Sequence, residues 1–333
     1  MQIPFLKSKI IAPVPEQGAQ PAVIQVENLA MQYRSQRNGV YAIEELNFSI
    51  PAGQMYGLLG PDGSGKTTTI RILATVLNAT HGNAWVGGFD THKKAKNVRS
   101  MVGYMPQNFS LYPDLSVLEN LNFFADTNGV HGSKKKERIE RMLGFTRLDQ
   151  FTLRRAANLS GGMKKKLALA CALLHEPRVL LLDEPSTGVD PVSRRELWLI
   201  LAQVVQEGVT VLVSTPYMDE AERCHQVGIL YQGKLLTTGT PTDLQNNLPF
   251  EIVEVKAKPR KVMRQVVSES AMVGKWRPIG DRLRLSVTDP HKTLRSLESE
   301  LLKAGAEIKL LRHAKRTMED VFISLVEERR EKQ

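Results

Sequence analysis

Cysteine, aromatic residues and long apolar runs are all scarce in this 333-residue sequence. The two cysteines, Cys171 and Cys224, fall in segments with a helical pattern and form no C-x-x-C pair. This argues against a disulfide framework or a zinc site and favours a reducing compartment. No run of about 18 apolar residues occurs, and the start of the chain lacks the pattern of a signal peptide. A role at a membrane would therefore require another chain to supply the span.

Acidic residues are fewer than basic residues, so the formal net charge is +10. A basic balance suits an anionic partner, such as a nucleotide, a nucleic acid or an anionic lipid surface, but it does not choose among them. A basic solvated surface without a specific patch explains the same charge equally well.

The pattern of apolar residues divides the chain into three parts. Residues 1–22 are expected to form a flexible tail. From 23 to 248, short β-branched runs alternate with helical stretches, which predicts an α/β domain. Two of its predicted helices are Ile70–Leu77 and Met163–His175.

Residues 249–333 change in character and carry more basic than acidic residues. Their pattern predicts strand, helix, two strands around Gly280, helix, strand and a last helix. The order βαββαβ with an extra helix predicts a small α+β domain of ferredoxin-like type. Chemistry-bearing residues do not cluster there, so we expect a regulatory or dimer-stabilising role.

A glycine-rich segment follows the apolar strand MYGLL and precedes a helix. It fits G-x-x-x-x-G-K-[ST], in which glycines let backbone N–H groups point at phosphate oxygens and the helix adds its positive end. Lys66 is expected to bridge the β- and γ-phosphates of ATP, and the Thr67 hydroxyl to coordinate Mg²⁺. The residues predicted to bind ATP here are Gly60, Pro61, Asp62, Gly63, Ser64, Gly65, Lys66, Thr67 and Thr68.

A second apolar strand ends in two carboxylates, Asp183 and Glu184. We expect Asp183 to hold Mg²⁺ through water and Glu184 to polarise the water that attacks the γ-phosphate. An ordinary strand end with solvated acids is the alternative, which the presence of the phosphate loop disfavours.

The residues between these motifs narrow the family. The segment LSGGM at 159–163 resembles the LSGGQ signature of ABC ATPases, and its serine and glycines at a helix start form a second phosphate-binding end. Gln107 resembles the Q-loop glutamine of that family, and Asp190 lies in a segment similar to its D-loop. Tyr33 stands where the family stacks an aromatic ring on adenine. Together, residues 23 to about 245 resemble a complete ABC nucleotide-binding domain.

This resemblance implies a P-loop ABC ATPase fold with a helical subdomain after Gln107. ABC domains work as head-to-tail dimers, in which each ATP lies between the phosphate loop of one chain and the signature of the other. ATP closes the dimer and hydrolysis reopens it. The resemblance assigns Mg²⁺ binding to Thr67, Gln107 and Asp183. It assigns further nucleotide contacts to Ser160, Gly161, Gly162 and Asp190.

The segments TPYMDEAE at 215–222 and TMEDVF at 317–322 resemble the ATPase subunits of multidrug and antibiotic exporters with separate type-2 permease chains. This implies permease partners at the cytoplasmic face of a membrane and a homodimer or heterodimer of ATPase chains, with no nucleic acid. The cargo is not disclosed, because such exporters select it in their membrane chains.

Two positions depart from the family pattern. Pro216 occupies the place of the switch histidine and has neither an N–H nor a titratable ring, and Met163 replaces the signature glutamine. His225 lies nine residues farther on and is a poor candidate to replace that histidine. An ATP-hydrolysing exporter subunit is thus favoured over an ATP-binding conformational module with little turnover. A soluble ABC protein acting on ribosomes or DNA is a third, weaker alternative.

Overall fold

The computed structural model of this chain describes residues 22–33, 41–108 and 111–331. The expected tail of residues 1–22 lies almost entirely outside these ranges. Within them, the chain divides into two compact units at Thr240 and Pro241. In the described ranges, no helix combines the length and the apolar character needed to cross a membrane.

The first unit contains two sheets. A four-stranded antiparallel sheet has the order β2-β1-β4-β5, and a six-stranded sheet has the order β10-β9-β3-β8-β7-β6. The larger sheet is parallel except for the β9–β10 pair. The strands are β1 (Ala22–Gln32), β2 (Tyr41–Pro51), β3 (Met55–Leu59), β4 (His81–Val86), β5 (Phe89–Asp90), β6 (Val102–Met105), β7 (Val179–Asp183), β8 (Thr210–Thr215), β9 (Gln226–Tyr231) and β10 (Lys234–Gly239).

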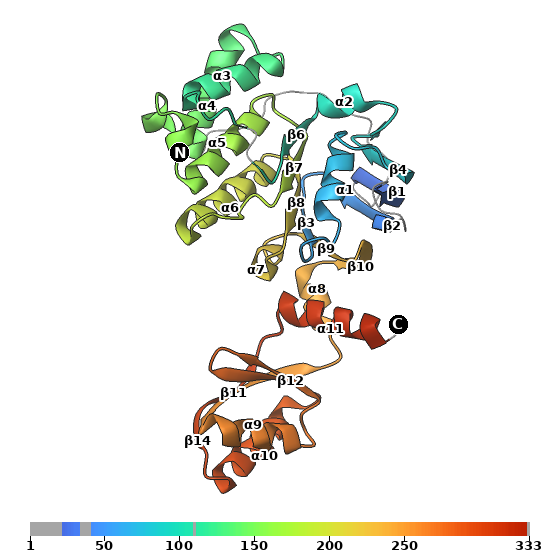
Figure 1. Cartoon of the computed structure of the whole chain (residues 1–333), viewed down its shortest axis with the longest axis vertical. Coiled ribbons are helices and arrows are strands. Elements are labelled where there is room, and N and C mark those ends of the chain that lie inside the picture. The colour runs from blue at the N-terminus through green and yellow to red at the C-terminus, as the bar shows by residue number, and fades with distance from the viewer. Residues whose placement is uncertain (1–21, 34–40, 109–110, 332–333) are drawn as a thin grey trace. The chain divides into compact units, whose positions relative to one another are not determined.

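Every residue of β3, β7 and β8 is buried, as continuous apolar runs in a parallel sheet require. Figure 1 shows α3, α4 and α5 grouped on one side of this sheet, and β1, β2 and β4 on the other. The predicted helical subdomain after Gln107 is therefore present. The helices of the unit are α1 (Lys66–Leu73), α2 (Ala95–Arg99), α3 (Val117–Thr127), α4 (Gly132–Thr146), α5 (Gly161–Leu173), α6 (Pro191–Gln206) and α7 (Met218–Ala221), with 3₁₀ turns at Asp149–Phe151 and Ala156–Asn158.

Two predicted helices begin earlier than expected. The helix predicted at Ile70–Leu77 spans Lys66–Leu73, because Gly65 at its N-cap adopts φ 107° and lets the loop turn directly into the helix. The helix predicted from Met163 begins at Gly161, because the Ser160 hydroxyl accepts from the Met163 N–H and caps it. Both shifts place glycine-rich motif residues in a first turn, where N–H groups are free to face a ligand.

The two cysteines are buried and free, but only Cys171 lies in a helix, α5. Cys224 lies in the turn between α7 and β9, and not in a helix as its sequence pattern indicated. Its position is fixed by close packing, since a Cβ on Gly57 would lie 2.9 Å from its sulfur.

The second unit has the predicted order βαββαβ plus a last helix. Its antiparallel sheet has the order β12-β13-β11-β14. The amphipathic helices α9 and α10 share an apolar core with the sheet, including Val255, Leu285, Leu297 and Leu301. The elements are α8 (Pro241–Asn246), β11 (Glu251–Lys258), α9 (Arg260–Glu269), β12 (Lys275–Ile279), β13 (Arg282–Val287), α10 (Pro290–Lys303), β14 (Glu307–Ala314) and α11 (Met318–Glu331).

The short helix α8 belongs to this second unit. Arg316 donates from Nη1 to the carbonyl oxygens of Gln245 at 3.1 Å and Asn246 at 2.8 Å. The structural division falls ahead of the boundary at 248 that composition indicated, and the contacts from Arg316 join α8 to the rest of the second unit.

Candidate nucleotide-binding site

The phosphate loop joins the buried strand β3 to α1 and has no room for side chains at its two ends. A Cβ on Gly60 would lie 2.2 Å from the carbonyl oxygen of Leu230, and one on Gly65 would lie 2.6 Å from that of Ala42. Gly65 also has a backbone conformation that L-residues rarely adopt. These two glycines are required by the backbone path, and the path turns the N-terminus of α1 toward the loop.

Lys66 is 3% exposed, and its amine lies inside the curl of the loop. Its Nζ donates to the carbonyl oxygens of Gly60 at 2.8 Å and Pro61 at 3.0 Å, and lies 3.4 Å from Glu184 Oε1. A buried ammonium is costly unless it is compensated, and here a carboxylate and carbonyl dipoles supply the compensation. The positive charge is thus held at the place where the predicted phosphates would need it.

Asp183 ends β7 and is fully buried. Its Oδ1 accepts from Ser214 Oγ at 2.7 Å and from Thr67 Oγ1 at 3.0 Å, whereas Oδ2 has no hydrogen-bond partner in the described part of the chain. Burial raises the pKa of Asp183, and the hydrogen bonds from Ser214 and Thr67 oppose that rise. A buried carboxylate with an unsatisfied oxygen beside a threonine hydroxyl has the oxygen donors that Mg²⁺ prefers. Asp183 and Thr67 therefore fit the predicted metal site.

Glu184 follows β7 with φ 47°, a backbone conformation that is uncommon for a residue with a side chain and is often found at functional sites. Its N–H donates to Ser214 Oγ at 3.0 Å. Its Oε2 accepts from Gln107 Nε2 at 2.9 Å and from Thr187 Oγ1 at 3.2 Å. The carboxylate is thus held by Gln107 and Thr187 at Oε2 and by Lys66 at Oε1, and Gln107 reaches it across 77 positions of the sequence.

Lys165 was not singled out by sequence reasoning, yet it joins this cluster from α5. It is 4% exposed, and its Nζ donates to the carbonyl oxygens of Gln107 at 3.1 Å and Glu184 at 3.3 Å. Burial lowers the pKa of Lys165, and the charges of Asp183 and Glu184 oppose that shift. Ser214 and Thr187 were also missed. Ser214 has no local sequence signal, because it contacts Asp183 from the neighbouring strand, whereas Thr187 lies only three residues after the Glu184 that it contacts.

A hollow of about 300 Å³ opens beside the loop. It is lined by Ala42, Asp62, Gly63, Ser64, Gly65, Lys66, Thr67, Thr68, Gln107 and Glu184. The structure therefore brings most of the predicted phosphate residues and two predicted catalytic residues into one cavity. Tyr33 lies at its edge, with its hydroxyl 3.4 Å from Thr68 Oγ1 and the side chain 40% exposed.

Four predicted nucleotide contacts in the signature and D-loop segments do not line this hollow, and Tyr33, Gly60 and Pro61 are also absent from its lining. A Cβ on Gly161 would lie 3.2 Å from the Gly188 carbonyl oxygen, so the signature packs beside the D-loop of its own chain. Asp190 caps α6 by accepting from the N–H groups of Val192 and Ser193. These four residues are Ser160, Gly161, Gly162 and Asp190.

Pro216 directly follows strand β8, which lies between β3 and β7 in the larger sheet. Its neighbour Thr215 donates to the buried carboxylate of Glu220, which also accepts from Ser186 and from Arg194 at 2.6 Å. Arg194 additionally stacks over the Tyr217 ring at 4.6 Å. The segment carrying Pro216 is therefore fixed by α6 and the turn after β7, although position 216 has no side chain that can donate to a phosphate.

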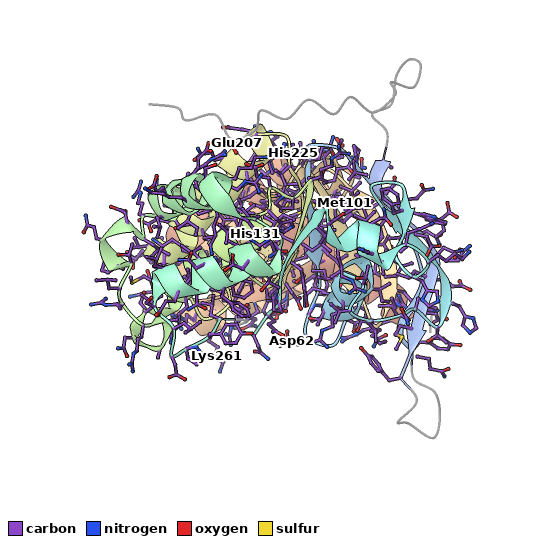
Figure 2. The ribbon with its side chains drawn as sticks, turned by 90° about the horizontal axis from the view of Figure 1, so that it is seen from above. Asp62, Met101, His131, Glu207, His225 and Lys261 are labelled. Carbon is purple, nitrogen blue, oxygen red and sulfur yellow. The ribbon has the colours of Figure 1, made fainter. Side chains whose placement is uncertain are left out.

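His225 does not compensate for Pro216. It lies in a bend, not in the helix that its sequence context indicated, and its Nδ1 accepts from the N–H of Met55 at 3.1 Å. Met55 begins β3, whereas the phosphate loop follows the other end of that strand. Figure 2 shows His225 and the loop residue Asp62 on opposite sides of the unit.

The strand–loop–helix cradle, the parallel sheet and the carboxylates after β7 define a P-loop nucleotide-binding fold with a helical subdomain. A family model described as ABC transporter matches residues 43–187. The Nod factor export ATP-binding protein I of Cupriavidus metallidurans is 33% identical over 306 residues, which cover 91% of this chain and 97% of that protein. The chain therefore belongs to the ABC transporter ATP-binding protein family.

Two further similarities concern the first unit. The probable multidrug ABC transporter ATP-binding protein YbhF of Escherichia coli strain K12 is 50% identical over 207 residues, which cover 62% of this chain. The match spans only 36% of YbhF, about a third of that protein's length. A solved structure of a dimeric bacterial ABC transporter cassette aligns with a TM-score of 0.61 at 25% identity and covers 65% of this chain and 98% of that one.

Proposed function

We propose that this chain binds Mg²⁺ and ATP in the hollow beside the phosphate loop, hydrolyses the ATP and drives a separate membrane permease for export. The observation that carries this proposal is the convergence of Lys66, Thr67, Glu184 and Gln107 on one cavity from separate elements, with the buried Asp183 hydrogen-bonded to Thr67. Relatives in the family are named for multidrug and Nod factor export, and these names support the proposed role in transport.

In this proposal each side chain has one task. Lys66 exchanges its contacts with the loop carbonyls and Glu184 for β- and γ-phosphate oxygens, because those oxygens carry more charge than a carbonyl dipole. Glu184 is then free to accept a proton from water, and Gln107 and Thr187 orient its carboxylate. Thr67 and Asp183 would hold Mg²⁺, which when bound neutralises phosphate charge.

The proposed working unit contains two copies of an ATPase domain. Ser160, Gly161 and Gly162 do not line the hollow of their own chain, so they are available to a nucleotide bound in another. The dimeric cassette of similar fold supports this arrangement. The partner is either the same chain or a second ATPase chain. The proposed location is the cytoplasmic face of a membrane, where a permease would bind the helical subdomain.

Replacement of Lys66 by Ala tests the nucleotide site. The loss of a charge-assisted hydrogen bond, about 1.5–3 kcal/mol, and of phosphate neutralisation should reduce ATP affinity by at least about tenfold. Lys94→Ala is the matched control, because Lys94 is an exposed lysine of the same unit. Titration calorimetry with Mg²⁺ and ATP measures both. Equal affinity in Lys66→Ala and Lys94→Ala would contradict the proposed site.

A second candidate is an ATP-binding conformational module with little turnover. Pro216 favours it, because this position lacks a group to contact the γ-phosphate and His225 is held at the far end of β3. Both candidates share the same ATP site and differ in the rate of phosphate release. Tight ATP binding without measurable steady-state phosphate release would favour the second.

A further inference from the structure

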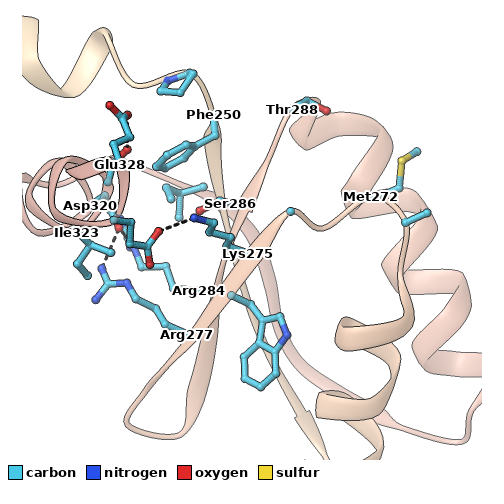
Figure 3. Close-up of a pocket in the computed structure, with 17 residues that line it drawn as sticks. Phe250, Met272, Lys275, Arg277, Arg284, Ser286, Thr288, Asp320, Ile323 and Glu328 are labelled. Carbon is cyan, nitrogen blue, oxygen red and sulfur yellow. Dashed lines mark hydrogen bonds and ion pairs between the residues drawn. The ribbon is translucent and has the colours of Figure 1, made fainter. Parts of the chain in front are cut away.

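A second hollow, of about 420 Å³, lies within the C-terminal unit and has no part in the proposed ATP chemistry. It is formed between α11 and the sheet strands β11, β12 and β13. Its apolar lining includes Phe250, Ile252, Met272, Trp276 and Ile323. Figure 3 shows Phe250 and Ile323 close to several charged side chains where α11 meets the sheet. A cavity of this size, with aromatic walls and a few polar groups, has the dimensions of a small-molecule site.

The positive charges that line this hollow already have partners. Lys275 lies 2.8 Å from Glu327, and Arg277 lies 2.8 Å from Asp320. Arg284 is 7% exposed and pairs with Asp320 at 2.7 Å and with Glu254 on β11 at 3.0 Å. An anionic ligand would have to compete with these carboxylates for each cation. The arginines are thus committed to the fold, and the hollow does not favour an anion.

The carboxylate of Glu328, at the rim of the hollow, differs from these paired cations. Within the residues that the structure describes, Glu328 has no ion pair, and its one contact is a 3.5 Å approach from Ser324 Oγ. Glu328 lies in the last turn of α11, where the helix dipole also favours a positive charge. Phe250 and Trp276 also line the hollow, and aromatic ring faces attract cations. An apolar cavity with one uncommitted carboxylate and two aromatic rings is complementary to a lipophilic cation.

We propose that the hollow between α11 and the sheet of the C-terminal unit binds a small lipophilic organic cation. Its apolar body contacts Phe250, Ile252 and Ile323, and its charge lies toward Glu328. Ser286 and Ser324 line the same space. The site is separate from the phosphate loop, so ligand binding there does not depend on ATP.

The experiment uses the full chain without nucleotide and two probes of matched shape and opposite charge, tetraphenylphosphonium and tetraphenylborate. Titration calorimetry should show saturable binding of the phosphonium, with the borate at least about tenfold weaker. Glu328→Gln should weaken phosphonium binding about two- to fivefold, the range of a solvent-accessible ion pair. Glu298→Gln on α10 is the matched control, because Glu298 is exposed and does not line the hollow.

A second variant tests the cavity itself. Ser286→Trp should fill the space from β13 and weaken phosphonium binding at least about tenfold, with an unchanged circular dichroism spectrum showing that the unit still folds. Equal affinity for both probes, or equal effects of Glu328→Gln and Glu298→Gln, overturns the proposal. So does a concentration-dependent dimer that excludes the phosphonium, which would assign the hollow to a second copy of the chain. Because ATP is absent throughout, these outcomes leave the proposed ATP function independently testable.

Discussion

Each unit of this chain contains a buried group of opposite charges, and the two groups differ in how completely they are satisfied. In the C-terminal unit, Asp320 accepts from Arg277, Arg284 and Thr317 through both carboxylate oxygens. In the first unit, Asp183 accepts through Oδ1 only, and Oδ2 has no partner within the described ranges.

The pKa values of the two aspartates shift in opposite directions. Burial by itself raises the pKa of Asp320, but hydrogen bonds from Arg284, Arg277 and Thr317 outweigh it and lower this pKa to about 2. At Asp183, burial outweighs the hydrogen bonds from Ser214 and Thr67 and raises the pKa. Burial of charge is therefore not what distinguishes a site from a structural cluster. What sets Asp183 apart from Asp320 is its unsatisfied Oδ2, which a bound ligand would complete.

The largest expected effect is on catalysis in the first unit. Glu184→Gln keeps the shape of the side chain but removes its basicity, so steady-state phosphate release should fall about 10²–10⁴-fold while ATP still binds. If the proposed dimer forms, the ATP-bound closed state should accumulate. Glu140→Gln, on the exposed face of α4, is the control and should hydrolyse ATP at the original rate. Turnover by Glu184→Gln at the original rate would remove the proposed role of Glu184.

The next effect is on the stability of the C-terminal unit. Asp320→Ala removes one partner each from Arg277 and Arg284, although Glu319 and Glu254 still pair with them. The free energy of unfolding should fall by about 2–3 kcal/mol, and the affinity for ATP should not change. Denaturant unfolding and calorimetry measure the two quantities. Asp281→Ala, which removes a solvent-exposed ion pair with Lys256, is the control and should have no measurable effect.

A smaller effect concerns the stability of the C-terminal unit at acidic pH. The pKa of Asp320 is lower in the folded chain than in the unfolded chain, so its stabilisation is complete above the unfolded value, about 4. It is lost as the pH falls from there toward about 2. Thermal unfolding of the original chain and of Asp320→Asn between these values should converge as the pH falls. A constant difference in melting temperature would show that the charge of Asp320 is not responsible.

The smallest expected effect concerns position 216. Pro216→His should leave the affinity for ATP unchanged and raise the rate of phosphate release, because an imidazole can position water and the γ-phosphate. Pro216→Ala is the control, since it relieves the constraint of proline without adding a polar ring. If both variants hydrolyse ATP at the original rate, the subfamily compensates at another residue and Pro216 does not limit turnover.

Local sequence was sufficient for the phosphate loop and for the order of elements in the second unit. A loop such as Gly60–Thr68 is specified by steric limits on consecutive residues, and alternation of apolar residues specifies each strand. Local sequence was less accurate at helix starts. The backbone angle of Gly65 decided where α1 begins, and the capping hydrogen bond of Ser160 decided where α5 begins. The switch-histidine position was identified by a resemblance between segments, and the structure added that His225 lies too far away to replace it.

The sequence by itself thus determined the nucleotide-binding motif, the α/β class and the family resemblance, because each depends on neighbouring residues. Tertiary structure decided which distant side chains form hydrogen bonds with one another. Ser214 reaches Asp183 across 31 positions, and Lys165 reaches Gln107 across 58. It also decided that arginines of the C-terminal unit pair with Glu254 and Asp320. No local pattern encodes such pairings, because packing of distant elements brings the charges together and burial then makes each unpaired charge costly.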